Sequence, residues 1–190
     1  MEPIWLAQYP AGVPATIDPD ATGTLPALFA ESCARYAERP ACRSLGHEMS
    51  YAELARRAGE FAAWLQGLGL APGTRVALMM PNVLQYPVAL FGTLMAGCTV
   101  VGVNPLYTPR ELQHQLADAG AEVIVILENF AHVLEAVVAR TAVRHIVVTA
   151  MGDLLPVPRR WLVNAVVRHV KKLVRPYELP QAIPFADTQA

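Results

Sequence analysis

The sequence is poor in charge, and this shortage excludes one class of ligand. Only 16% of the 190 residues are charged, whereas 54% are hydrophobic. A typical soluble domain has about 25% charged residues. The formal net charge is -1, and nucleic-acid binding needs a basic surface, so we expect no nucleic-acid partner. The low charge also favours a chain that buries one face against a partner.

Cysteine is scarce as well, and its positions predict neither disulfides nor zinc. Cys33, Cys42 and Cys98 form no C-x-x-C pair and lie within apolar stretches. The histidines show no H-x-x-x-H or H-E-x-x-H spacing. We therefore predict no metal site and a reducing compartment.

No secretory signal opens the sequence, because residues 1–5 contain an acidic residue and a proline where a basic region and an apolar core are needed. This favours a cytoplasmic protein. Residues 76–109 lack Asp, Glu, Lys and Arg, but a membrane-spanning helix needs about 20 continuous apolar residues. Pro81, Pro87 and Pro105 interrupt the run, so we predict buried core.

What the sequence does contain is a regular alternation of strands and helices. Strands are predicted at residues 75–79, 99–103, 122–127 and 145–149, and helices between them at 83–96, 109–119 and 130–140. Such spacing is typical of βαβ units. The strands are apolar on both faces, which requires cover on both sides. The predicted fold class is α/β, with a layered, mainly parallel sheet flanked by helices.

The segments around this core divide the chain into three parts. Residues 1–23 are predicted as an extended N-terminal arm, and residues 24–150 as the α/β subdomain, which opens with a helix at 25–38 and a hairpin at 42–50. Residues 151–190 are predicted as a linker with Pro156 and Pro158, a basic amphipathic helix at 159–176 and a tail. The tail shows no capped element, which suggests truncation.

Two capping boxes fix helix starts within the subdomain. Ser50 and Glu53 form an S-x-x-E pattern, and Thr108 and Glu111 form a T-x-x-E pattern with Pro109 at the first helical position. Tyr107 and Thr108 follow a predicted parallel strand, where open α/β sheets bind ligands. Because the cap already explains Thr108, we favour a structural role for both over ligand contact.

The usual catalytic motifs are absent. The sequence has no G-x-x-x-x-G-K-[ST] phosphate loop and no G-x-S-x-G nucleophile elbow. The strand ends at residues 79–82 and 103–105 carry no carboxylates, which excludes a flavodoxin-like phosphoacceptor. We assign no catalytic, cofactor-binding or metal-binding residue.

The basic helix is the remaining candidate for a functional surface. Its basic residues and a tryptophan form a candidate contact with an anionic membrane surface. These residues are Arg159, Arg160, Trp161, Arg168, Lys171, Lys172 and Arg175. The alternative is a domain helix that packs its valines on the core and leaves its lysines in water.

Several motifs, in order along the chain, are similar to those of a known family. They are Met49-Ser50-Tyr51-Ala52-Glu53-Leu54, residues 76–82, Tyr86-Pro87-Val88-Ala89, Ala96-Gly97, residues 103–112 and Asn129-Phe130-Ala131-His132. Together they resemble the adenylate-forming acyl-CoA synthetases, most closely the bacterial long-chain fatty-acid–CoA ligases. Met49 stands where the family usually has leucine. The resemblance runs from about Thr24 to Phe185.

This resemblance implies that the chain is the first part of a large N-terminal domain. The whole enzyme would use ATP and Mg²⁺ to convert a fatty acid into an acyl-adenylate and then transfer the acyl group to CoA. The family's reactive groups are a Ser/Thr/Gly-rich loop ending in lysine, an acidic magnesium ligand, a hinge and a lysine of the C-terminal domain. All lie outside this sequence, so we expect the chain to be inactive alone and to bind none of these cofactors.

The implied partners are the remainder of the ligase and, through it, the fatty acid. A homodimer and a peripheral site on the inner face of the membrane are further options. The alternative from another class is a stand-alone membrane-peripheral or protein-interaction module with the same fold.

Overall fold

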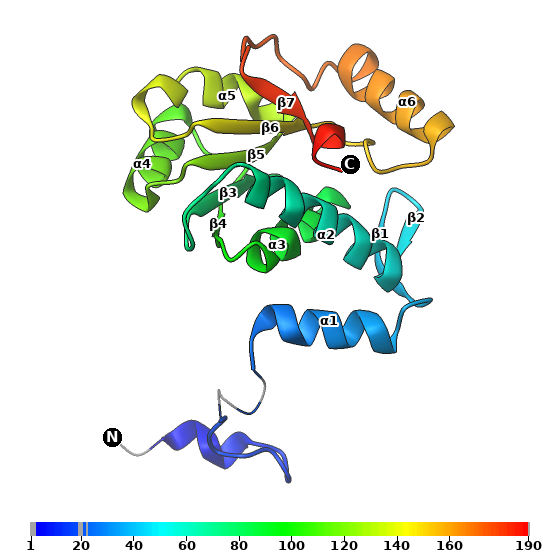
Figure 1. The fold of residues 1–190 in the computed structure, drawn as a ribbon, viewed down its shortest axis with the longest axis vertical. Helices are drawn as coiled ribbons and strands as arrows, with labels where there is room; N and C mark the ends of the chain where they lie inside the picture. The colour runs from blue at the N-terminus through cyan, green and yellow to red at the C-terminus, as the bar shows by residue number, and fades with distance from the viewer. Residues whose placement is uncertain (1–2, 19–20, 22, 190) are drawn as a thin grey trace.

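A five-stranded parallel sheet organises the chain, as the computed structural model shows for residues 3–18, 21 and 23–189 (Figure 1). The strand order is β4-β3-β5-β6-β7, and all neighbouring pairs are parallel. The strands are β3 (Arg75–Met79), β4 (Thr99–Gly102), β5 (Val123–Leu127), β6 (His145–Thr149) and β7 (Ala182–Pro184). The first four lie within a residue of their predicted bounds. The predicted α/β class with a mainly parallel sheet is confirmed.

Helices cover both faces of this sheet. One face packs against α2 (Tyr51–Gly67) and α3 (Gln85–Met95), and α1 (Leu25–Arg35) packs on the outer side of these two helices. The other packs against α4 (Pro109–Ala119) and α5 (Ala131–Glu135). Every residue of β5 is fully buried, and its side chains alternate between the two cores. A parallel strand covered on both sides needs this continuous apolar sequence.

Local side-chain bonds explain where the helices begin. Thr108 caps α4 with both bonds of a capping box, and the bonds from its backbone N–H and its hydroxyl lower the pKa of Glu111. Ser50 caps α2 by accepting from the Glu53 N–H. The second capping box is only half formed, because the Glu53 carboxylate binds arginines of the next turn instead.

The predicted hairpin is confirmed. Strands β1 (Pro40–Ser44) and β2 (His47–Ser50) pair antiparallel. The two residues between them, Leu45 and Gly46, have φ of +49° and +70°. Positive φ at both central positions is typical of the tight turn that matches the twist of a hairpin.

Two predicted helices differ in the structure. The helix expected at 130–140 is broken into the 3₁₀ turn Glu128–Phe130, α5 and the 3₁₀ turn Val138–Arg140. The basic helix expected at 159–176 is instead α6 (Val157–Ala165) followed by a π-helical turn, Val166–Val170. Lys172 leaves the helix with φ of +51°. In a helix, Pro176 would have no N–H to donate to the carbonyl of residue 172, and its ring would clash with that carbonyl. A regular helix therefore could not continue to the predicted end at residue 176.

The tail, for which no capped element was predicted, does contain secondary structure. Residues 182–184 form β7 at the edge of the sheet, and the 3₁₀ turn Phe185–Thr188 follows. Phe185 is fully buried, with its ring 5.7 Å from that of Phe61 in α2. Three strand residues are too few to show a period, and Pro184 is tolerated because β7 is an edge strand.

The N-terminal arm is not extended throughout. Residues Ile4–Gln8 form a 3₁₀ turn, and the segment 3–18 lies away from the sheet in Figure 1. The division of the chain at residues 23 and 150 stays a prediction. Within the described ranges, no helix combines the length and the apolar character needed to cross a bilayer.

Candidate functional site

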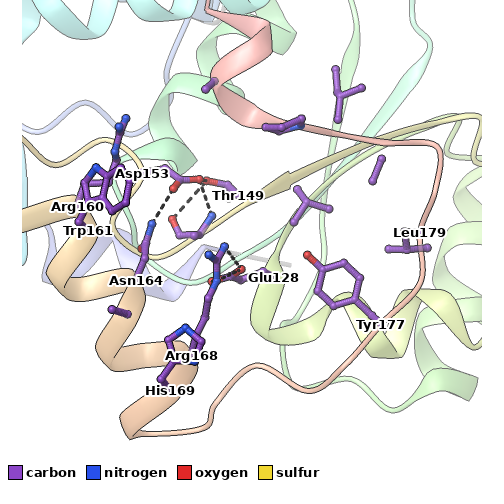
Figure 2. Close-up of a pocket in the computed structure, with 17 residues that line it drawn as sticks. Glu128, Thr149, Asp153, Arg160, Trp161, Asn164, Arg168, His169, Tyr177 and Leu179 are labelled. Atoms are coloured by element: carbon purple, nitrogen blue, oxygen red, sulfur yellow. Dashed lines mark hydrogen bonds and ion pairs between the residues drawn. The ribbon is translucent and has the colours of Figure 1, made fainter. Parts of the chain in front are cut away.

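A cavity of about 650 Å³ opens beside the carboxyl ends of β5 and β6, between α6 and β7 (Figure 2). The carboxyl ends of parallel strands are where open α/β sheets bind ligands. The cavity is therefore the natural place to look for function. Its polar walls come from Glu128, Thr149 and Asp153 at the strand ends and from Asn164 and Arg168 on the helix.

A buried ion pair forms one wall. Glu128 follows β5 directly and is only 2% exposed. Arg168, from the π-helical turn, donates to both carboxylate oxygens, from Nε at 3.1 and 2.9 Å and from a terminal nitrogen at 2.6 Å. These bonds raise the pKa of Arg168. The pair fastens the end of the helix to the end of β5.

The turn after β6 is tied by a second polar cluster. Thr149 ends β6, and its hydroxyl accepts from the Gln85 side chain at 2.9 Å and donates to Asp153 at 3.1 Å. The same Asp153 oxygen accepts from the Ala150 N–H at 2.7 Å. Gln85 also donates to the Ala150 carbonyl at 2.8 Å, which links α3 to this turn.

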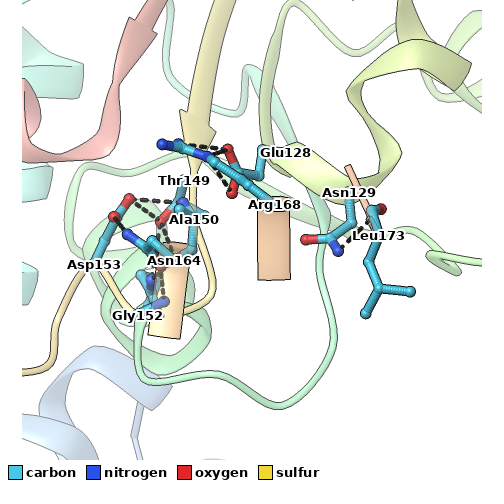
Figure 3. A network of polar contacts seen from close by, with 10 residues as sticks. Glu128, Asn129, Thr149, Ala150, Gly152, Asp153, Asn164, Arg168 and Leu173 are labelled. Carbon is cyan, nitrogen blue, oxygen red and sulfur yellow. Dashed lines mark hydrogen bonds and ion pairs between the residues drawn. The ribbon is translucent and has the colours of Figure 1, made fainter. Parts of the chain in front are cut away.

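Asn164 joins α6 to that cluster (Figure 3). Its amide nitrogen donates to Asp153 at 3.0 Å, and its oxygen accepts from the Gly152 N–H at 2.8 Å. A Cβ on Gly152 would lie 2.8 Å from this oxygen, so only glycine allows the close approach. The helix is thus held by polar bonds at two points, at Asn164 and at Arg168.

The far wall is aromatic and apolar. Tyr177 and Leu179 precede β7, and Figure 2 shows the Tyr177 hydroxyl on the side of Glu128. Burial, followed by the nearby Glu128 charge, raises the pKa of Tyr177. The wall therefore keeps a neutral phenol beside the ion pair.

Both carboxylates that line the cavity are already engaged in hydrogen bonds or an ion pair. Its two lining carboxylates are Glu128, which binds Arg168, and Asp153, which binds Thr149 and Asn164. Through these bonds, Glu128 and Asp153 position α6 and the turn that follows it. The arrangement is that of a framework joining strand ends to α6.

The structure separates the residues predicted for a membrane contact. Arg160, Trp161 and Arg168 line the cavity. Arg159 turns the other way and donates to the Gly46 carbonyl of the hairpin at 3.2 Å. The other three, Lys171, Lys172 and Arg175, are exposed in the coil after the π-helical turn.

Sequence reasoning missed the cavity's central polar residues, Glu128, Thr149, Asp153, Asn164 and Tyr177. One signal was present, since Glu128 is the first charged residue after a wholly apolar strand. The structural interpretation of Tyr107 and Thr108 agrees with the structure, in which Tyr107 packs against the core and Thr108 caps α4.

The residues present do not fit the magnesium that the resemblance implies for a whole enzyme. Across the described part of the chain, no group of three or more His, Cys, Asp or Glu side chains could hold a metal ion. Glu128, the buried carboxylate, is already bound by Arg168. We derive no catalytic step from these residues.

Comparison with curated proteins finds close relatives of one kind. The chain is 57% identical over 186 residues to a long-chain-fatty-acid–CoA ligase of Yersinia pestis, covering 97% of this chain and 33% of that protein. A ligase of the same name from Haemophilus influenzae is 48% identical over 188 residues, covering 98% and 34%. The chain spans about a third of the length of these relatives.

Solved structures share the fold at lower identity. A luciferase-like enzyme from the mealworm Zophobas morio superposes with a TM-score of 0.69 at 18% identity, over 92% of this chain and 36% of that one. A long-chain-fatty-acid–CoA ligase from Archaeoglobus fulgidus gives a TM-score of 0.64 at 22% identity, over 74% and 30%.

The family described as AMP-binding enzyme matches residues 29–184, which include all five strands of the parallel sheet. By this match, the chain belongs to the AMP-binding enzyme family.

Proposed function

We propose that this chain is the first third of a long-chain fatty-acid–CoA ligase and forms its first layered α/β unit. The observation that carries the proposal is the 57% identity to the Yersinia pestis ligase across 97% of the chain. The polar framework around Glu128 and Asp153 supports it, because those groups hold elements together. The chain acts as scaffold for a nucleotide-binding part that packs against it.

The whole enzyme would carry out an adenylyl transfer followed by an acyl transfer. The fatty-acid carboxylate attacks the α-phosphate of ATP, which gives an acyl-adenylate and releases pyrophosphate. The CoA thiol then attacks the acyl carbon and displaces AMP. Mg²⁺ would neutralise the phosphates in the first step. This chain supplies none of the reacting groups, and its partners are the remainder of the ligase and, through it, the fatty acid, in the cytoplasm.

A chimera tests the scaffold assignment. Residues 1–189 replace the matching third of the Yersinia pestis ligase, and the purified chimera is assayed for acyl-CoA formation from a long-chain fatty acid. We expect turnover within about tenfold of the parent, since the replaced part holds no reacting group. A folded chimera without activity would contradict the proposal.

Two aspartate substitutions in that chimera compare a buried scaffold position with an exposed surface position. Val125→Asp places a charge in fully buried β5 and should abolish folding and activity. Leu106→Asp lies in an exposed turn and should leave activity unchanged.

The isolated chain should release no pyrophosphate from ATP and a long-chain fatty acid. Release above the background of a Val125→Asp sample would show that the chain carries its own reactive groups. The alternative of a stand-alone module is less well supported, because the two relatives described above are long-chain-fatty-acid–CoA ligases. A reading frame that continues beyond Ala190 into a glycine-rich loop would favour the ligase further.

A further inference from the structure

The N-terminal arm carries large apolar side chains that the described part of the chain leaves exposed. Within residues 3–18, Trp5 is 58% exposed and Ile17 is 84% exposed. Ile4, Tyr9 and Val13 are exposed as well. Burial of such side chains is favourable, and exposed apolar groups that gather in one segment mark interaction sites. The arm is therefore a candidate contact surface.

The composition of the arm limits the kind of partner it can bind. Residues 3–18 contain no lysine or arginine, and their only charged residue is Asp18. Interface cores are likewise poor in charge and rich in aromatic residues. The segment also has three prolines, which restrict its free conformations and lower the entropy lost on docking. These features suit an apolar protein surface.

The arm has local order of its own. Residues Ile4–Gln8 form a 3₁₀ turn, in which the Leu6 N–H bonds the Pro3 carbonyl at 3.0 Å. Every side chain of residues 3–18 is at least partly exposed. Figure 1 shows the arm beyond α1, on the side of this helix that faces away from the sheet. Its apolar groups are thus displayed outside the α/β unit.

Helix α1 adds to the same side of the molecule. It buries only Phe29 and Cys33, and the Phe29 ring stacks on Phe91 of α3 at 3.9 Å. Its side chains Leu25 and Leu28 are exposed. One face of α1 therefore holds the helix to the body, while two leucines remain open beside the arm in sequence.

The arm lies outside the family match but inside the match to the close relatives. The AMP-binding enzyme family matches from residue 29 onward. The Yersinia pestis ligase matches 97% of the chain and the Haemophilus influenzae ligase 98%, so most of the arm lies within both matches. The arm is an addition to the family core that has a place in a whole ligase.

We propose that the arm docks on the remaining two thirds of its own ligase molecule, with Trp5 and Ile17 as anchors in apolar pockets of that part. This inference rests on the proposed function. The chain spans about a third of its relatives, so the missing part offers ample surface. Buried tryptophans are frequent anchors of protein contacts.

Two other partners fit the arm less well. A second copy of the chain would have to compete with a surface of the same polypeptide, whose effective concentration is high because the two are covalently joined. An anionic lipid surface attracts lysine and arginine, and residues 3–18 have neither.

The test is hydrogen exchange measured by mass spectrometry on two proteins. One is the 190-residue chain, and the other is the chimera that joins residues 1–189 to the rest of the Yersinia pestis ligase. We expect the amides of residues 3–18 to exchange rapidly in the chain and at least about tenfold more slowly in the chimera. Burial of one large apolar side chain changes an equilibrium constant by about this factor.

A double variant of the chimera identifies the anchors. Trp5→Ser with Ile17→Ser should return exchange in the arm to the rate seen in the isolated chain. The matched control is Leu45→Ser with Leu106→Ser, which also removes two exposed apolar side chains, at turns elsewhere in the chain. We expect the control to keep the arm protected. Circular dichroism checks that each protein is folded.

Three results would overturn the proposal. The first is equally fast exchange of the arm in the isolated chain and in a folded chimera. The second is an equal loss of protection in both double variants. The third is protection that rises with protein concentration together with a dimeric mass in sedimentation velocity, which would assign the arm to a second copy of the chain.

Hydrogen exchange does not depend on turnover, so the two proposals can fail separately. An inactive chimera with a protected arm would contradict the scaffold assignment and support the docking of the arm. An active chimera with an unprotected arm would do the reverse.

Discussion

At the residue scale, the ion pair of Glu128 and Arg168 fixes the position of α6 relative to β5. The carboxylate is buried at the end of β5, whereas the arginine side chain is 48% exposed. Arg168 therefore remains partly hydrated, and the greater cost of desolvation falls on Glu128. The pair stabilises the fold chiefly because it gives the buried Glu128 carboxylate a partner of opposite charge.

Arg168→Ala should destabilise the chain by about 2 kcal/mol, a value discounted from the usual cost of breaking a buried pair because Arg168 is half-exposed. Adding Glu128→Gln should recover part of this loss, because no buried charge then remains. The measurement is the urea midpoint for each variant. Arg160→Ala is the control, and a double variant no more stable than Arg168→Ala would contradict the explanation.

Residue-level features were predictable where both partners are close in sequence. Thr108 and Glu111 of the capping box are three positions apart, so their pattern could be recognised in the sequence. Glu128 and Arg168 are 40 residues apart. No local sequence pattern links them, because their contact forms only when the chain folds and brings the end of β5 next to the end of α6.

At the element scale, the crossing of α2 and α3 depends on one glycine. A Cβ on Gly92 would lie 2.7 Å from the Ala58 carbonyl oxygen and 2.8 Å from the Phe61 ring. Both distances are shorter than real Cβ contacts. Gly92 lets the two helices approach closely enough to bury Phe61 completely.

Gly92→Ala should therefore destabilise the chain by about 1–3 kcal/mol through overpacking, although alanine favours helix. Gly59→Ala in α2 is the matched control, since no heavy atom lies within 4 Å of its added Cβ. That change should stabilise by about 0.5–1 kcal/mol. Urea unfolding of both variants measures whether each change lowers or raises the free energy of unfolding. A Gly92→Ala variant more stable than the parent would contradict the close packing of α2 and α3.

Elements with uninterrupted apolar runs were predicted well, whereas elements whose ends depend on tertiary contacts were not. The strands β3 and β6 match their predicted bounds because their apolar runs are uninterrupted. The amphipathic pattern of residues 159–176 predicted one continuous helix. The pattern contains no information on the ion pair of Arg168 with Glu128. It also does not take into account that Pro176 cannot continue a helix. Tertiary contacts decided both the orientation of α6 and its end.

At the scale of the whole molecule, the two ends of the described chain differ in their role. The tail returns to the sheet through β7 and buries Leu179, Phe185 and Thr188. The described arm residues 3–18 bury no side chain, and Trp5 and Ile17 are exposed. The sequence suggested a loose segment at each end, because neither end shows a period long enough to recognise.

Deleting residues 177–190 should thus cost much of the stability, whereas deleting residues 1–18 should change it by less than about 0.5 kcal/mol. Phe185→Ala alone should cost about 3–5 kcal/mol, a large share of the roughly 5–15 kcal/mol typical of a folded domain. Ile17→Ala, at an exposed site, is the control. Urea unfolding followed by circular dichroism compares the four proteins with the parent. Equal midpoints for the two deletions would contradict the pairing of β7 with β6, since removing an edge strand must expose the apolar surface it covers.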